Sequence, residues 1–415
     1  MPGSWANPVP NERRLATGWM SSWSLARRSL ARYAAAGLAM TVVGCGPASQ
    51  NRASETPGRT SVPPIPQPPP SASPIPGYLD PRRWAGRTVT VASQGGDYQD
   101  AQTAAIFDPF AAATGARVQQ KSATDLGALR QQVDQGSVTW DLADVPTDEV
   151  LPLARANYLT PVDYQKVDRT PLFESVALQH AVGAAFFSTV LVYSIAASHP
   201  PSGWVDFWHV DRFPGGRSLR RSPIGTLEFA LMADGVRAGD LYPLDIGRAF
   251  ASLDKIRPFI TEWYDNARQP VALVLTGDVT MASSYNVLAE ATDARSSLRI
   301  QWNGGMLSAD SWVIPRGAQN VDVAMDLINF ATRAIPSANF SRLVPFGPVN
   351  RNAFGLLEPG RLALLPNTDP HRAEQFLQNW NWWADNRESV IKRFDDWFLA
   401  EPTPDPAVGT SAVPS

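Results

Sequence analysis

The stretch Arg-Thr-Val-Thr-Val at residues 87–91, followed by Gln-Gly-Gly at 94–96, predicts a short buried β-strand that ends at a glycine pair. A helix follows, because Ile106 and Phe110 recur at helical spacing along one face. Gly115 is placed to end that helix, since glycine adopts the left-handed conformation common just after a helix. The sequence therefore predicts a strand–helix unit at the start of the folded region.

The same alternation continues along the chain. Residues 116–119 predict the next strand, and Leu126, Leu129 and Val133 predict a helix by their i, i+3, i+7 spacing. Residues 140–144 then predict a third strand. Strands that alternate with helices at these intervals are typical of parallel βαβ units, so we expect an α/β fold.

Length, charge and cysteine content limit the class of protein. The chain has 415 residues and a net charge of −3, which suggests two domains, or one domain of two lobes, and no nucleic-acid partner. Cys45 is the single cysteine, which excludes an internal disulfide and a zinc site built from cysteines. The four histidines are not spaced as metal ligands. We therefore expect no metal and no cofactor.

The N-terminal region has the pattern of an export signal. An arginine pair at 27–28 precedes an uncharged stretch at 33–43, and Val-Val-Gly-Cys at 42–45 is similar to the bacterial lipobox. We expect residues 1–45 to be a lipoprotein signal peptide, with translation starting at Met1 or at Met20. Cys45 would then carry a lipid anchor on the bacterial cell membrane, facing the periplasm or the exterior. The arginine pair fits either general secretion or twin-arginine export.

A change of composition follows the cysteine. A run of prolines between Pro63 and Pro76 excludes helix and central strand and favours extended polyproline II. We interpret residues 46–86 as a disordered linker that holds a folded region, about 87–400, away from the membrane. Residues 401–415 are expected to be a disordered tail.

Four groups of short stretches, in chain order over about 310 residues, are similar to one known family. They are Val-Ala-Ser-Gln-Gly-Gly-Asp-Tyr-Gln at 91–99; Trp-Asp-Leu at 140–142 with 158–163; Trp-Val-Asp-Phe-Trp at 204–208 with 213–217; and Ala-Asp-Ser-Trp-Val-Ile-Pro at 309–315 with 346–350. The chain resembles the polyamine-type (spermidine/putrescine-binding) extracellular solute-binding proteins of bacterial ABC importers.

The resemblance implies two α/β lobes joined by crossing hinge strands, with one ligand bound in the cleft between them. We place lobe one at 87–185 plus 307–350 and lobe two at 186–306 plus 351–400. Ligand binding would close the hinge, and ABC permease subunits with their ATPase would recognise the closed, loaded form. The protein is expected to act as a monomer and not as an enzyme.

The resemblance also implies a set of ligand contacts. Tyr98 and Asp310 fall on an aromatic position and on a carboxylate position of the family. Ser308 replaces an aromatic residue, and Ser222 and Gly225 stand where the family has an acidic pair. The candidate ligand residues are Gln94, Gly95, Tyr98, Thr147, Asp148, Ser222, Ser283, Tyr285, Asp310 and Trp383.

These departures change the expected ligand. Every ammonium group of a buried polyamine needs a carboxylate or an aromatic face, and Arg220 and Arg221 would oppose a trication. A monocationic or zwitterionic solute fits better: an amine, a choline- or betaine-like compound or an amino-acid derivative. Asp310 would bind the cationic group of such a ligand. An arginine or a backbone N–H would bind an anionic group at its other end. Asp97, Asp144 and Asp148 could add charge, or could instead be helix caps or solvated loop residues.

Other interpretations stay open at this point. Trp383 could belong to an aromatic cage, but core packing of a terminal helix is the default for the tryptophan-rich stretch at 380–397. The sequence has no Gly-x-Ser-x-Gly elbow and no phosphate-binding loop, which argues against an enzyme. No adjacent tyrosine pair is available for ferric iron. A lipoprotein sensor or scaffold with the same fold is the remaining alternative.

Overall fold

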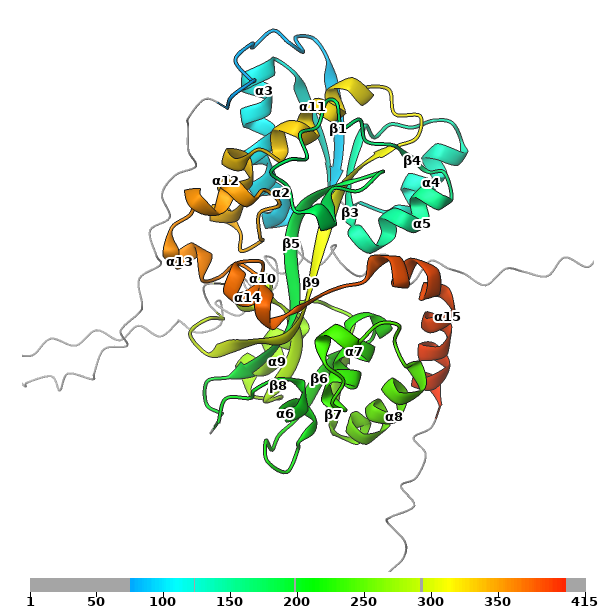
Figure 1. Ribbon diagram of the computed structural model, residues 1–415, viewed down its shortest axis with the longest axis vertical. Helices are drawn as coiled ribbons and strands as arrows, with labels where there is room; N and C mark the ends of the chain where they lie inside the picture. Colours follow the sequence, from blue (N-terminus) through cyan, green and yellow to red (C-terminus); the bar gives the residue numbers. More distant parts are fainter. Residues whose placement is uncertain (1–74, 123, 198, 292–293, 401–415) are drawn as a thin grey trace, which may run out of the picture.

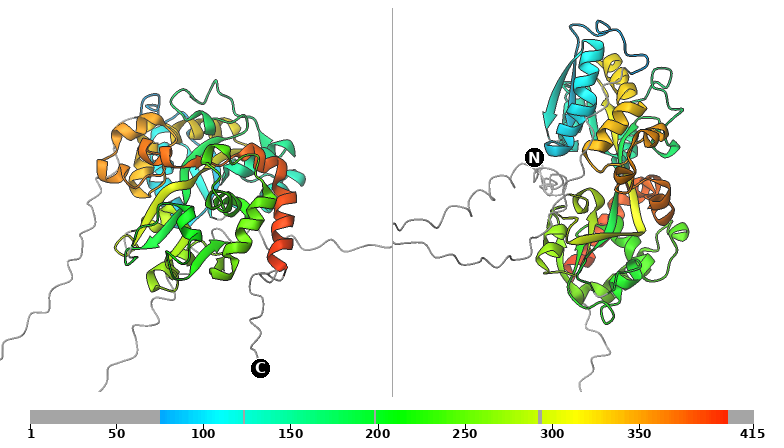
Figure 2. Two further views of the ribbon diagram at one scale, coloured as in Figure 1. Left: turned by 60° about the horizontal axis from the view of Figure 1, so that its bottom comes forward. Right: turned by 90° about the vertical axis from the view of Figure 1, so that its left-hand side faces the viewer.

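The computed structural model describes residues 75–122, 124–197, 199–291 and 294–400, and shows two lobes one above the other (Figure 1, Figure 2). Two long antiparallel strands run through both lobes, β5 (Val182–Ser194) and β9 (Leu298–Pro315). All main strands form one sheet in the order β2-β1-β3-β9-β5-β8-β6-β7, with β4 and β10 paired to β9. The expected α/β fold with hinge strands is confirmed.

Lobe one contains the predicted strand–helix units. Its parallel strands are β1 (Thr88–Ser93), β2 (Arg117–Ser122) and β3 (Leu142–Pro146), and β4 (Leu159–Thr160) pairs with β9. Its helices are α2 (Gly96–Gln102), α3 (Asp108–Thr114), α4 (Leu126–Asp134), α5 (Val150–Arg155), α11 (Val321–Ala331) and α12 (Ala334–Leu343), with a π-helical turn between α2 and α3 and the 3₁₀ turn η5 (Thr147–Glu149) after β3. Gly115 caps α3 in the left-handed conformation, as its position predicted.

Lobe two is built on β6 (Arg217–Arg220), β7 (Ile260–Tyr264) and β8 (Met281–Tyr285). Its helices are α6 (Trp204–Trp208), α7 (Pro223–Ala233), α8 (Ile246–Ile256), α9 (Gln269–Thr276), α10 (Asn286–Ala289) and α15 (Trp380–Leu399). A third crossing between the lobes carries α14 (Asp369–Glu374) and β10 (Phe376–Leu377). Trp383, Val390 and Phe394 of α15 are buried in the apolar core of lobe two.

Strand direction brings loops of the two lobes together. β1, β3 and β5 run one way, whereas β9, β8, β6 and β7 run the other way. The carboxyl ends of the lobe-one strands therefore point toward lobe two, and those of β6 and β8 point toward lobe one. Ligand sites of open α/β sheets lie at such carboxyl ends, so this topology places a site where the lobes meet.

Two of the expected boundaries differ from the structure. Residues 75–86, assigned to the linker, are packed on lobe one: Tyr78 is buried and its hydroxyl donates to Asp326 Oδ1 at 2.9 Å. Trp84 Nε1 also donates to Asp326, at 2.6 Å. Residues 351–366, assigned to lobe two, instead pack on α12 of lobe one, where Leu365 joins a small apolar cluster. In both cases apolar side chains of the segment are buried against lobe one, and removing this surface from water favours the packing.

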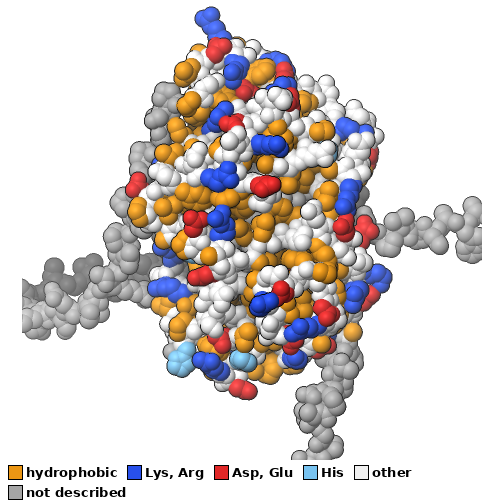
Figure 3. Space-filling model, in the orientation of Figure 1, with side chains coloured by type: hydrophobic (Ala, Val, Ile, Leu, Met, Phe, Trp, Pro, Cys, Tyr) orange, Lys and Arg blue, Asp and Glu red, His pale blue; other side chains and the backbone are white. Residues whose placement is uncertain are grey.

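Several expectations fall outside the described residues. These are the signal peptide with Met20 and Cys45, most of the linker and the tail at 401–415. Within the ranges that the structure describes, no helix has the length and apolar character needed to cross a membrane. On the face seen in Figure 3, cationic and anionic side chains are interspersed without a basic patch, in keeping with the small net charge.

Candidate ligand-binding site

One face of the hinge strands collects the side chains of the site. Asp310 of β9 pairs with Pro146 of β3, two residues after Asp144, and Phe187 of β5 pairs with Ser308 of β9. Side chains of directly paired residues share a face, and alternate residues along a strand return to it. Asp144, Ser308, Asp310 and Phe187 therefore lie on one face of the sheet. Tyr285 joins them through its partner on β5, Thr189.

Two buried carboxylates form one end of this site. Asp144 and Asp310 are 1% and 0% exposed. The Tyr98 hydroxyl donates to Asp144 Oδ2 at 2.8 Å, and Gln102 Nε2 donates to the same oxygen at 2.7 Å. Asp144 Oδ1 and both carboxylate oxygens of Asp310 have no hydrogen-bond partner within the described part of the chain. An ionised carboxylate is costly to bury without a partner, so these three oxygens are available to a donor from outside the protein.

Burial controls the protonation of this pair. It raises the pKa of Asp144 to about 7, although the bonds from Tyr98 and Gln102 oppose the rise. It raises the pKa of Asp310 well above the ordinary range, and the negative charge of Asp144 adds to the effect while the neighbouring Gln94 amide opposes it. A cation bound between them would favour the ionised forms of both.

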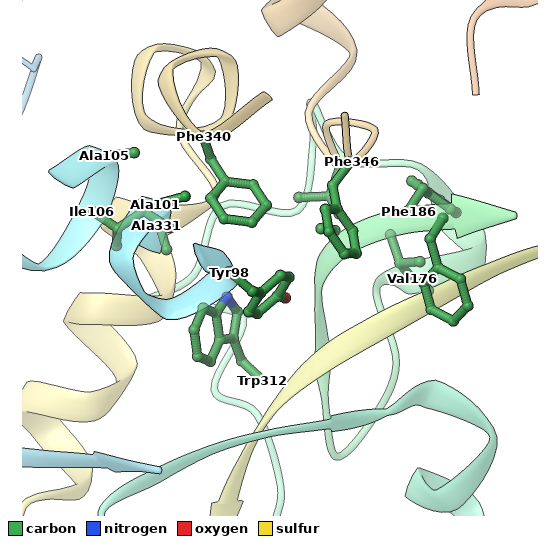
Figure 4. Close-up of a cluster of buried hydrophobic side chains, with 14 of the residues drawn as sticks. Tyr98, Ala101, Ala105, Ile106, Val176, Phe186, Trp312, Ala331, Phe340 and Phe346 are labelled. Carbon is green, nitrogen blue, oxygen red and sulfur yellow. The ribbon is translucent and has the colours of Figure 1, made fainter. Parts of the chain in front are cut away.

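Aromatic rings connect this acidic end to lobe two. The ring centroids of Tyr98 and Phe346 are 4.8 Å apart (Figure 4), those of Phe346 and Phe187 are 6.4 Å apart, and those of Phe187 and Tyr285 are 5.6 Å apart. The guanidinium carbon of Arg220 lies 5.8 Å from the centroid of the Tyr285 ring. We refer to these four aromatic side chains as the aromatic wall. It extends from the two acids in lobe one to Arg220 in lobe two.

Arg220 supplies the basic end. It is the last residue of β6, it is half-buried, and among the described residues it forms no ion pair within 4.0 Å. Its neighbour Arg221 is more exposed and lies 4.0 Å from Asp265. A half-buried guanidinium without a carboxylate partner, positioned over an aromatic ring, is suited to bind an anionic group.

The start of α7 lies next to Arg220. Ser222 caps the helix by accepting from Ile224 N at 3.3 Å. Gly225 has φ of 83° and its amide donates to Glu228 Oε2 at 2.9 Å, a conformation that glycine adopts without strain. A side chain on Gly225 would also press on Met306 of β9, so this turn packs closely against the hinge.

The structure brings part of the predicted set together. Gln94, Tyr98 and Asp310 lie at the acidic end, where the buried Gln94 amide is close enough to Asp310 to oppose the rise in its pKa. Tyr285 lies at the basic end of the aromatic wall. Gly95 ends β1 in a positive-φ conformation and its amide donates to the Gln99 side chain at 3.0 Å.

Four other predicted residues have their polar groups engaged elsewhere. Thr147 Oγ1 lies 2.7 Å from Ser311 Oγ, on the opposite face of β9, and Ser283 Oγ lies 3.2 Å from the Tyr264 hydroxyl. Trp383 is fully buried and its Nε1 donates to Glu228 Oε1 at 2.8 Å, in keeping with the core-packing alternative. Asp148 pairs with an arginine of α15.

The structure also adds residues that the sequence did not select. Phe187 and Phe346 come from β5 and from the loop after α12, and no local pattern marks them as lining residues. The sequence pattern leaves Asp144 as either an additional charge or a helix cap or solvated loop residue. Its position two residues before the end of a buried strand is the signal that favours a role in the site. No group of three His, Cys, Asp or Glu residues is placed to hold a metal ion in the described ranges.

Comparisons with known proteins agree with this geometry. Residues 105–356 match the family model described as bacterial extracellular solute-binding protein. A γ-aminobutyric acid-binding protein of Pseudomonas aeruginosa is 32% identical over 320 residues, which cover 75% of this chain and 91% of that protein.

Solved structures extend the likeness to the fold. An ABC transporter substrate-binding protein from Bradyrhizobium japonicum is similar with a TM-score of 0.73 at 36% identity, covering 76% of this chain and 100% of that one. A structure titled as the Atu4243–GABA receptor is similar with a TM-score of 0.71 at 32% identity, covering 76% of this chain and 98% of that one.

Proposed function

Because the chain belongs to the bacterial extracellular solute-binding proteins, we propose that it captures a small zwitterionic amine between its lobes and delivers it to an ABC permease. The ligand we favour is an ω-amino acid, with an ammonium group and a carboxylate separated by a short methylene chain. The P. aeruginosa relative is named for γ-aminobutyric acid, a compound of this kind.

The unpartnered oxygens of Asp144 and Asp310 are the observation that carries this proposal. An ammonium group has three donors, and three buried acceptor oxygens are free on these two residues. A cation placed there would offset the cost of burying both charges, as a neutral sugar could not. The ammonium group would also lie beside Tyr98, the first of the aromatic side chains that line the site.

Arg220 would bind the opposite end of the ligand. The arginine and the two acids lie on different lobes, so a zwitterion that contacts both would be bound best when the cleft is closed. The methylene chain would lie along Phe187 and Phe346, which offer only apolar surface. This arrangement couples ligand length to closure of the hinge, the step that a permease can recognise.

Delivery requires partners outside this chain. We propose that permease subunits and an ATPase accept the loaded protein. We also propose that a lipid on Cys45 keeps the protein, as a monomer, near them at the membrane surface.

A ligand panel tests the proposed class. At a hundredfold excess over Kd, a ligand of the native state stabilises it by about 2.7 kcal/mol, which a thermal shift detects. We expect γ-aminobutyric acid or another ω-amino acid to raise the melting temperature, and spermidine, sugars and ferric salts to leave it unchanged. Tighter binding of spermidine than of every zwitterion would contradict the proposal.

Replacing Arg220 separates zwitterion binding from simple cation binding. Arg220→Met keeps an unbranched apolar side chain on the Tyr285 ring and removes the charge, so we expect affinity for an ω-amino acid to fall by about a hundredfold, equivalent to about 3 kcal/mol for a charged hydrogen bond. Affinity for n-butylamine, which lacks the carboxylate, should change little. Calorimetric titration measures both.

Arg221→Met is the matched control for that substitution. It removes the same charge one residue away, where the side chain is 41% exposed and only 4.0 Å from Asp265. Equal losses in the two variants, or an equal loss for butylamine, would assign the effect to overall charge and not to a carboxylate contact.

A further inference from the structure

Helix α15 belongs to lobe two but also contacts lobe one. Its apolar side chains Trp383, Val390 and Phe394 are buried in the core of lobe two. Its first turns lie beside α5 of lobe one, as Figure 1 shows at the right-hand edge of the molecule. The helix therefore spans the junction between the lobes on one side of the ligand site.

Two ion pairs join Arg387 of α15 to lobe one. One guanidinium nitrogen pairs with Asp148 Oδ2, and the other lies 3.0 Å from Glu149 Oε1. Asp148 and Glu149 belong to η5, directly after β3. The three side chains are 19%, 13% and 16% exposed, so water is largely excluded from both pairs. We refer to Arg387, Asp148 and Glu149 as the clasp.

The clasp is connected to the hinge strand that carries the site. Asp148 Oδ2 also accepts from Gln378 Nε2 at 3.3 Å. Gln378 Oε1 in turn accepts from Ser308 Oγ at 2.9 Å. Ser308 lies two residues before Asp310 on β9, so a continuous set of hydrogen bonds runs from α15 to the neighbour of the ligand carboxylate.

We propose that Arg387 is a positioning residue that holds the lobes together over the bound ligand, and that Asp148 acts through this clasp and not by touching the ligand. Opening the lobes would pull Arg387 away from Asp148 and Glu149 and leave two adjacent carboxylates facing each other. This raises the free energy of the open form relative to the closed form. The observed affinity of a hinged binding protein rises with its closed population. The inference rests on the proposed function for its ligand but not for its conformational test.

Ligand release is the first readout. In Arg387→Gln we expect γ-aminobutyric acid, or the ω-amino acid that the panel selects, to dissociate about tenfold faster in stopped-flow measurements, with little change in the association rate. Loss of a positive charge near Asp310 would by itself attract a cationic group more strongly. Slower or unchanged dissociation would therefore overturn the clasp.

Arg155→Gln is the matched control. Arg155 of α5 pairs with Asp385 of α15 at 2.5 Å across the same junction, but the two side chains are 51% and 56% exposed. Exposed pairs contribute little, so release from this variant should match that of the wild type. An equal acceleration in both variants would mean that any charge lost from this interface loosens it, against a specific role for Arg387.

A mutant cycle separates the clasp from ligand contact at Asp148. Asp148→Asn with Glu149→Gln should accelerate release as Arg387→Gln does, and the triple variant should be no faster than either. Further loss of affinity from Asp148→Asn in the Arg387→Gln background would make Asp148 a ligand residue and contradict the proposal.

Small-angle scattering of the ligand-free full chain gives a test that needs no ligand. We expect a larger radius of gyration for Arg387→Gln than for wild type or Arg155→Gln, because the open form gains population. Identical values for all three would overturn the clasp even if the panel succeeds. A panel without any binding would instead count against the proposed function, while an expanded Arg387→Gln would still support the clasp.

Discussion

Asp310→Asn should strongly weaken binding of a zwitterionic amine and at the same time stabilise the ligand-free protein. The substitution keeps the size of the side chain and removes the charge that would bind the ammonium group. Truncating one partner of a buried charged hydrogen bond typically costs about 2–5 kcal/mol, so we expect affinity to fall by at least about thirtyfold. Calorimetric titration at neutral pH measures this loss.

The gain in stability follows from the pKa of the same group. Burial raises the pKa of Asp310 in the folded state above that of the unfolded chain. A carboxyl group with a raised folded pKa stabilises the fold fully below its unfolded pKa, and this contribution is lost as pH rises toward the folded pKa. At pH 7 the unfolded chain gains free energy by ionising Asp310, and asparagine removes this gain. We therefore expect a melting temperature several degrees higher for the variant at pH 7, and a smaller difference at pH 4.

Asp97→Asn is a suitable control, because Asp97 is an exposed residue in the first turn of α2 near the same junction. It should change neither affinity nor melting temperature appreciably. If the Asp310→Asn variant keeps wild-type affinity, the ammonium group binds elsewhere. A variant that loses both affinity and stability would show that Asp310 supports the fold through contacts of its own.

The sequence was sufficient for the fold because the hydrophobic periods and the family stretches agree over most of the folded region. Strand β1, the break at Gly95 and the helix ending at Gly115 could each be predicted from neighbouring residues. The site could be predicted only in part, because its composition depends on strand register. Asp310 and Asp144 share a face because Pro146 pairs with Asp310, and no local pattern specifies that pairing.

The sequence and the structure disagree most for residues whose partners are far away along the chain. Asp148 lies just after a strand, a position typical of ligand-binding residues in this kind of sheet. Its ion-pair partner Arg387, however, lies 239 positions away along the chain. Trp383 was a candidate for a cage, whereas its indole N–H is held by Glu228, 155 positions away. Both pairings depend on where α15 packs against the two lobes, and local sequence propensity does not specify that packing.

Ligand affinity should depend strongly on pH because binding requires both carboxylates to be ionised. Burial raises the pKa of Asp144 to about 7 and that of Asp310 well above its ordinary range in the ligand-free protein. A bound ammonium group lowers both values, so binding releases protons. Below pH 7 binding releases up to two protons, so affinity should fall as pH decreases, by up to about a hundredfold for each pH unit. An ω-amino acid keeps its own ionised groups over this range, since carboxyl and amino groups titrate near 4 and 10.

Calorimetry in buffers of different ionisation enthalpy measures the released protons directly. We expect proton release near pH 7 that is reduced in Asp144→Asn, since that variant has one raised carboxyl group fewer. Proton uptake on binding would contradict this assignment, because it would require a group that becomes protonated in the complex. Affinity that stays constant between pH 5 and pH 8 would mean that neither acid contacts the ammonium group, and the acidic end would then lose its proposed role.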